Sequence, residues 1–105
     1  MNLCRILKIT TVAVIFGMAM PVTPYAYPGR QFSSQAKVTI DQARSIAEKA
    51  VPGKIVTEEL EKEKGGSGLR YSFDIKGKDG VVHEVGVDAK SGKVLERSIE
   101  HKGAD

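Results

Sequence analysis

The two histidines are the side chains of this sequence that titrate nearest to neutral pH, which makes them the first candidates for acid-base chemistry. His83 alternates with Val81 and Val85 on what should be the apolar face of a strand. It is therefore expected to pack in a core rather than to act as a catalytic base. His101 lies close to the C-terminus beside Glu100 and lacks the partner geometry that a general base requires. Neither histidine predicts a catalytic site.

Nucleophilic and phosphate-binding chemistry is also without support in the sequence. Ser33, Ser34 and Ser45 have no recognisable nucleophile context, and the run Gly65-Gly66-Ser67-Gly68 lacks the Lys and Ser or Thr that complete a P-loop. Cys4 is the single cysteine and precedes the apolar N-terminal stretch. A chain processed after that stretch would hold no disulfide and no thiol nucleophile. We therefore predict no catalytic residues, and expect a protein that is not an enzyme.

One acidic run offers oxygen atoms of the kind that calcium prefers: Glu58, Glu59, Glu61 and Glu63. Lys62 and Lys64 are interleaved with it, and the spacing is not that of a calcium-binding loop. The run is expected to form a solvated face. We predict no metal site and no cofactor.

The N-terminus has the pattern of an export signal. Arg5 and Lys8 precede an uncharged, mostly apolar stretch over residues 9–20, and Ala26 follows as a cleavage position. The stretch is shorter than the about 20 residues that span a bilayer, which argues against a retained anchor. Ala36 is the more distant alternative for cleavage. The sequence thus predicts a secreted or periplasmic protein without a stable membrane anchor.

Length and charge limit the remaining classes of function. A chain of 105 residues holds one domain at most. Its net charge is +3, but removing Arg5 and Lys8 from the 16 basic residues leaves 14 against 13 acidic ones. So small an excess gives no electrostatic case for binding nucleic acid.

A single amphipathic helix is expected over residues 40–50. Thr39 and Gln42 have the spacing of a capping box, and apolar residues including Ile46 then recur at helical intervals. Pro52 and Gly53 should end the helix. Residues 27–36 show no apolar periodicity and are expected to form a flexible lead-in.

The period then changes to two, which predicts antiparallel strands. A three-residue loop at residues 78–80, with Gly80 left-handed, would pair Ile75 with His83, Phe73 with Val85 and Tyr71 with Val87. A second three-residue loop at residues 90–92 would place Leu95 opposite Val87 and Ile99 opposite His83. The predicted core follows from these registers: Ile46, Tyr71, Phe73, Ile75, Val85, Val87 and Leu95.

Residues 54–64 have mixed preferences, since their first residues favour a strand and the following acidic run favours a helix. We interpret them as a strand at or near a sheet edge, followed by a flexible loop over residues 65–68. The expected fold class is α+β, with one amphipathic helix packed on an antiparallel sheet of three to four strands. The expected segments are a signal peptide (1–26), the lead-in (27–36), a domain (37–100) and a C-terminal tail (101–105).

From about Val38 to Ile99 this order of features resembles a PepSY domain, a module of metallopeptidase propeptides and bacterial envelope proteins. The resemblance rests on the helix IDQARSIAEKAVPGK, the aromatic strand YSFDI, the strand VVHEVGVDA and the ending VDAKSGKVL. Asp88 and Gly92 fall on the family's most recognisable turn. There Gly supplies a positive φ and Asp caps nearby backbone amides.

The resemblance implies a binding or inhibitory module and brings no catalytic residues. The 105 residues contain no HExxH motif, so inhibition would act in trans on a separate protein. The implied partner is a secreted or periplasmic peptidase. The alternative is an accessory or sensory envelope protein that binds a partner other than a peptidase.

Overall fold

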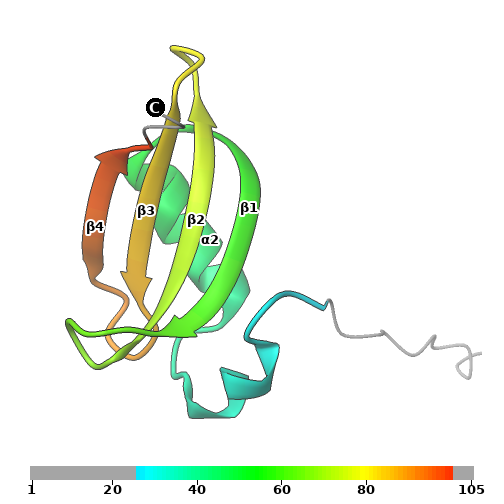
Figure 1. Ribbon diagram of the computed structural model, residues 1–105, viewed down its shortest axis with the longest axis vertical. Helices are drawn as coiled ribbons and strands as arrows, with labels where there is room; N and C mark the ends of the chain where they lie inside the picture. The colour runs from blue at the N-terminus through cyan, green and yellow to red at the C-terminus, as the bar shows by residue number, and fades with distance from the viewer. Residues whose placement is uncertain (1–25, 101–105) are drawn as a thin grey trace, which may run out of the picture.

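The computed structural model describes residues 26–100, which form one helix layer and one sheet layer (Figure 1). The elements follow in the order η1 (Arg30–Gln35), α2 (Ile40–Ala50), β1 (Gly53–Lys62), β2 (Leu69–Gly77), β3 (Val82–Asp88) and β4 (Val94–Ile99). The strands form one antiparallel sheet in the order β1-β2-β3-β4, with α2 across one face. The expected α+β class, with one helix packed on an antiparallel sheet, is confirmed.

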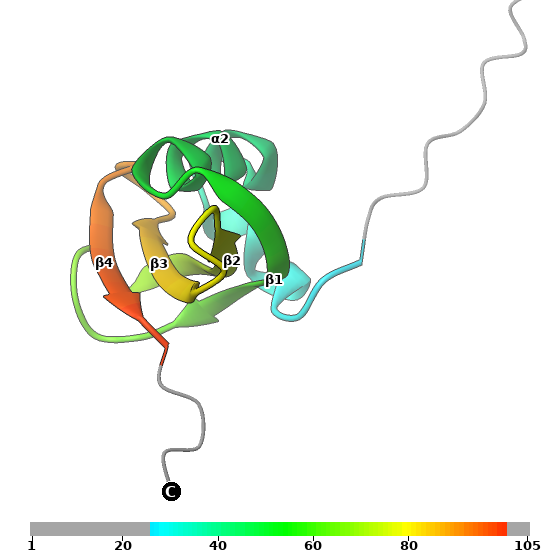
Figure 2. The same cartoon turned by 90° about the horizontal axis from the view of Figure 1, so that it is seen from above.

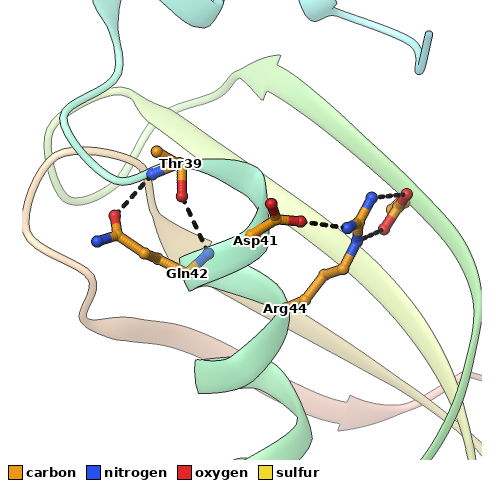
Figure 3. A network of polar contacts seen from close by, with 5 residues as sticks. Thr39, Asp41, Gln42 and Arg44 are labelled. Atoms are coloured by element: carbon orange, nitrogen blue, oxygen red, sulfur yellow. Dashed lines mark hydrogen bonds and ion pairs between the residues drawn. The ribbon is translucent and has the colours of Figure 1, made fainter. Parts of the chain in front are cut away.

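Helix α2 begins at the capping box. The Thr39 hydroxyl accepts a hydrogen bond of 3.1 Å from the Gln42 backbone N–H, and the Gln42 side-chain oxygen accepts one of 2.9 Å from the Thr39 N–H (Figure 3). Both bonds satisfy N–H groups that have no partner within the helix. Ala43 and Ala47 are fully buried and let the helix approach the sheet closely.

The hairpin of β2 and β3 has the expected register. Ile75 pairs with His83, Phe73 with Val85 and Tyr71 with Val87. Gly80 has a φ of 81°, a left-handed conformation in which glycine carries no steric penalty. The parity of the apolar residues therefore placed this hairpin correctly.

The pairing predicted for Leu95 is wrong. Val94, rather than Leu95, lies opposite Val87, because a bulge interrupts the ladder between Gly86 and Val87. The turn is also one residue longer than expected. Ala89 leaves the β3–β4 ladder, and its N–H bonds the Leu69 carbonyl at 2.8 Å. Leu95 is consequently only partly buried.

The core lies between α2 and the inner face of the sheet. Tyr71, Phe73, Ile75, Val85 and Val87 are buried there, whereas Ile46 packs against the core from its margin. The Tyr71 hydroxyl donates a hydrogen bond of 2.7 Å to the Val38 carbonyl, just before the helix. Burial raises the pKa of Tyr71 to about 12, so the hydroxyl keeps its proton across the physiological range.

Residues 27–36 do not form the flexible lead-in that was expected. They contain η1, and Tyr27 and Phe32 pack against the core. The Leu60 N–H of β1 donates to the Pro28 carbonyl at 2.9 Å, which attaches this segment to the outer edge of β1 (Figure 2). Gly29 permits this contact, because a Cβ on it would lie 1.6 Å from the Leu60 oxygen. These contacts join residues about 30 positions apart, which local patterns do not report.

The predicted leader over residues 1–25, the predicted tail and His101 lie outside the described residues. Within residues 26–100, no helix is long and apolar enough to cross a membrane.

Replacing Phe73 by Ala should destabilise the fold strongly, because Phe73 is fully buried and its removal would leave a cavity. The expected loss is about 3 to 5 kcal/mol, a large part of the stability of a small domain. Urea unfolding followed by circular dichroism measures it. Val94→Ala is the control, since Val94 is exposed, and it should cost well under 1 kcal/mol. Equal midpoints for the two variants would contradict the described core.

Candidate binding site

Asp88 is a buried carboxylate that holds two loops together. It is 2% exposed, and its Oδ2 accepts a hydrogen bond of 2.6 Å from the Ser67 N–H. Oδ1 accepts from the Ser67 hydroxyl at 2.9 Å and from the N–H groups of Lys90 and Ser91 at 2.8 and 3.1 Å. The β1–β2 loop and the β3–β4 turn are thereby fixed to one side chain.

The ionisation of Asp88 follows from these contacts. Burial alone would raise the pKa of the carboxyl, but the N–H groups of Ser67, Lys90 and Ser91 and the Ser67 hydroxyl outweigh burial. They lower the pKa of Asp88 to about 2. Gly92 has a φ of 79°, which completes the turn at the other end. Asp88 and Gly92 thus lie at the two ends of the turn that connects β3 to β4.

The face of the sheet opposite α2, here called the outer face, is acidic. The strand registers place there Glu59, Glu61, Arg70, Ser72, Asp74, Glu84, Glu96, Ser98 and Glu100, with Lys54 and Lys76 at the end nearest the β2–β3 hairpin. Its centre is hollowed between Glu59, Asp74, Glu84 and Glu100. Burial and then the charges of Glu96, Asp74, Glu100 and Glu61 raise the pKa of Glu84. The negative charges of these carboxylates add up at the centre of the face and attract cations.

Arg70 is the one arginine of the outer face and is 7% exposed. It lies over Gly86, where a Cβ would come within 3.2 Å of its Nη1. Nη2 donates to the Lys64 carbonyl at 3.0 Å, and Nη1 lies 3.4 Å from the Glu96 carboxylate. Arg70 therefore anchors the β1–β2 loop and leaves the acidic character of the face largely intact.

A second polar cluster joins the helix to the sheet. The Arg44 Nε and Nη2 donate to the two oxygens of Glu58 at 2.8 and 2.9 Å, and Arg44 also pairs with Asp41 (Figure 3). This bidentate geometry links α2 to β1 beside a groove along the first half of β1. Of the predicted acidic run, Glu58 therefore faces the helix, while Glu59 and Glu61 belong to the outer face.

The structure places the remaining candidates apart from one another. His83 is partly exposed near the β2–β3 hairpin, and its Nε2 lies 3.2 Å from the Asp79 carboxylate. This position differs from the packed core site expected for it, because the sheet extends beyond the end of α2 there. Ser33 and Ser34 lie on η1, and Ser45 is exposed on α2. Within residues 26–100, no group of three His, Cys, Asp or Glu side chains is arranged to hold a metal ion.

The arrangement is that of a small domain with one charged sheet face and a sheet that ends at β1 and at β4. A family model described as "Peptidase propeptide and YPEB domain", or PepSY, matches residues 37–97. The match covers more than half of the 105 residues, and the chain belongs to the PepSY family. Neither the curated proteins nor the solved structures include a significant match.

Replacing Asp88 by Asn should remove much of the acid dependence of stability. Because the folded-state pKa of Asp88 is lowered, its contribution is complete above about pH 4 and is lost as the pH falls towards about 2. The melting temperature of the parent should fall across this window, and that of Asp88→Asn should start lower and change less. Thermal melts at several pH values measure both.

Glu48→Gln is the control, since Glu48 is an exposed carboxylate on α2 away from the two loops. Its profile should follow the parent. An Asp88→Asn profile that is parallel to the parent between pH 4 and pH 2 would show that the loops are held by other contacts.

Proposed function

We propose that this protein is an exported module that regulates a peptidase in trans by non-covalent contact. The observation that carries the proposal is the PepSY match over residues 37–97, whose description names peptidase propeptides. A propeptide domain acts by occupying the surface of a separate folded domain. The parts of this protein that could bind are therefore the faces and edges of its sheet.

The geometry supports action by contact. The outer face is wide, and the edge strand β4 can pair with an extended segment of a partner. The loops at one end are held by Asp88 and Arg70, so a partner meets a surface that is already ordered. Binding to an ordered surface loses less conformational entropy.

Export is part of the proposal, and we propose cleavage after Ala26. Its support is the charge and length of the N-terminal stretch. The contacts of Tyr27 and Phe32 favour this position over Ala36, because cleavage after Ala36 would remove both side chains and η1 from the fold. The site after Ala26 leaves every core contact of the described residues in place.

The mature protein should begin at Tyr27 and be recovered outside the cytoplasm. Intact-mass spectrometry of the native protein, from cell fractions, measures both. An intact Met1 in a soluble cytoplasmic fraction would contradict export, and a chain beginning at Lys37 would contradict the cleavage position.

The purified protein should slow cleavage of a protein substrate by a metallopeptidase from the same envelope, in proportion to the complex formed. The rate is measured while the protein is titrated against fixed peptidase. His83→Ala should inhibit equally when it is equally folded, because contact and not proton transfer is the mechanism. If envelope peptidases are unaffected while affinity capture returns a sensor or another envelope protein, the inhibitor role fails and the accessory role replaces it.

A further inference from the structure

The two edges of the sheet are unequal, and β1 is the closed one. The Leu60 N–H is already bonded to the Pro28 carbonyl, and η1 lies beside the strand. A bulge between Ile55 and Thr57 breaks the line of the edge. Bulges and covering segments are the devices by which proteins prevent a further strand from pairing. A partner strand would have to displace part of this protein's own fold to bind there.

The edge at β4 is open. The Glu100 N–H donates to the Val82 carbonyl at 2.9 Å, so the even-numbered residues at this end bond inward to β3. By the alternation of an antiparallel ladder, the backbone groups of Arg97 and Ile99 point away from the sheet. Within the described part of the chain, no segment pairs with them.

The helix-facing side of β4 carries Val94, Arg97 and Ile99, and it is only partly covered. Val94 and Ile99 are 39% and 50% exposed, and they lie opposite Val87 and His83 on the inner face. Helix α2 packs mainly on β2 and β3 and leaves this margin partly open (Figure 1, Figure 2). A strand added beside β4 could place apolar side chains beside Val94, Ile99 and the aliphatic part of the Arg97 side chain.

The other side of β4 belongs to the acidic outer face. Glu96 and Glu100 flank Ser98 along the strand, and Glu84 lies opposite Ser98 on β3. Side chains of an added strand that point to this side would lie beside these three carboxylates. Opposite charges on neighbouring strands stabilise a sheet, and like charges destabilise it.

We propose that the edge of β4 binds an extended segment of a partner protein in which apolar and basic residues alternate. The apolar residues pack beside Val94 and Ile99, the basic ones meet Glu84, Glu96 and Glu100, and the backbone pairs with Arg97 and Ile99. The assignment deepens the proposed contact function and rests on it. It commits to one edge and to one sequence pattern in the partner.

A second copy of this chain fits the edge poorly. Antiparallel pairing of two β4 strands would put Glu96 and Glu100 of both copies on one continuous outer face. Four carboxylates would then face each other across the new pair of strands, which is destabilising. The charge of the face therefore selects a basic segment over self-association.

Labelled nine-residue peptides test the pattern directly. One alternates Val and Lys, one alternates Val and Glu, and one has the Val and Lys residues in two blocks. Fluorescence anisotropy with the purified protein should give at least about tenfold tighter binding of the alternating Val-Lys peptide than of the other two, from several cross-strand pairs together. Equal affinities for the three peptides would overturn the proposal.

Variants locate the binding edge. Arg97→Pro removes an outward N–H but no inward ladder bond, and proline is tolerated on edge strands, so binding should be lost while the circular dichroism spectrum is kept. Ile99→Lys should also weaken binding, at least about fivefold. Val56→Lys is the matched control, because Val56 is 48% exposed on the other edge, and it should bind like the parent. Loss of binding in Val56→Lys alone would overturn the assignment.

Charge reversal and oligomeric state complete the test. Glu100→Lys should reduce the preference for the Val-Lys over the Val-Glu peptide several-fold, and an unchanged preference would overturn the role of the outer face. A concentration-dependent dimer that Ile99→Lys abolishes would make a second copy the occupant and overturn the proposal. Selective peptide binding without any effect on peptidases would support the β4 site and remove only the inhibitor role.

Discussion

The hydrogen bonds of the ionised Asp88 carboxylate are the interaction on which one end of this fold depends. Two loops that are distant in sequence converge on it through Ser67, Lys90 and Ser91. The next residue, Ala89, extends the same junction, because its carbonyl accepts the N–H groups of Lys37 and Val38 at 2.9 Å each. The start of the helix, the loop after β1 and the turn before β4 are thereby held by two adjacent residues. A small domain without a disulfide in its described part gains order from such a junction that packing alone would not supply.

The division of the sheet into an inner and an outer face determines what the molecule can contact. One short helix covers the middle of the inner face, and the buried aromatic side chains of Tyr71 and Phe73 fill the space beneath it. The outer face carries charged and polar residues, which remain hydrated and need no covering layer. Because six of those residues are carboxylates and their basic neighbours lie towards the ends, the centre of the face carries a negative charge.

The sequence was most informative where the contacts are local or follow a strict period. The capping box at Thr39 and the hairpin register through Phe73 could be predicted, because each depends on residues a few positions apart. The position of Leu95 could not, since it depends on a bulge opposite Gly86 and Val87 and on a longer turn in which Ala89 bonds distant backbone groups. The ordered structure of residues 27–36 was also missed, because Phe32 packs on a core formed by residues distant in sequence. Burial of Arg70 carried no local signal either.

The covered edge at β1 also limits how copies of this protein can assemble. A head-to-tail fibre of sheets needs the last strand of one molecule to add to the first strand of the next, and so on without closure. Here the first strand is already occupied by the Pro28 carbonyl at Leu60 and is interrupted by its bulge. Each molecule is therefore a chain terminator for strand addition. That property keeps the open edge at β4 from starting the growth of a fibre.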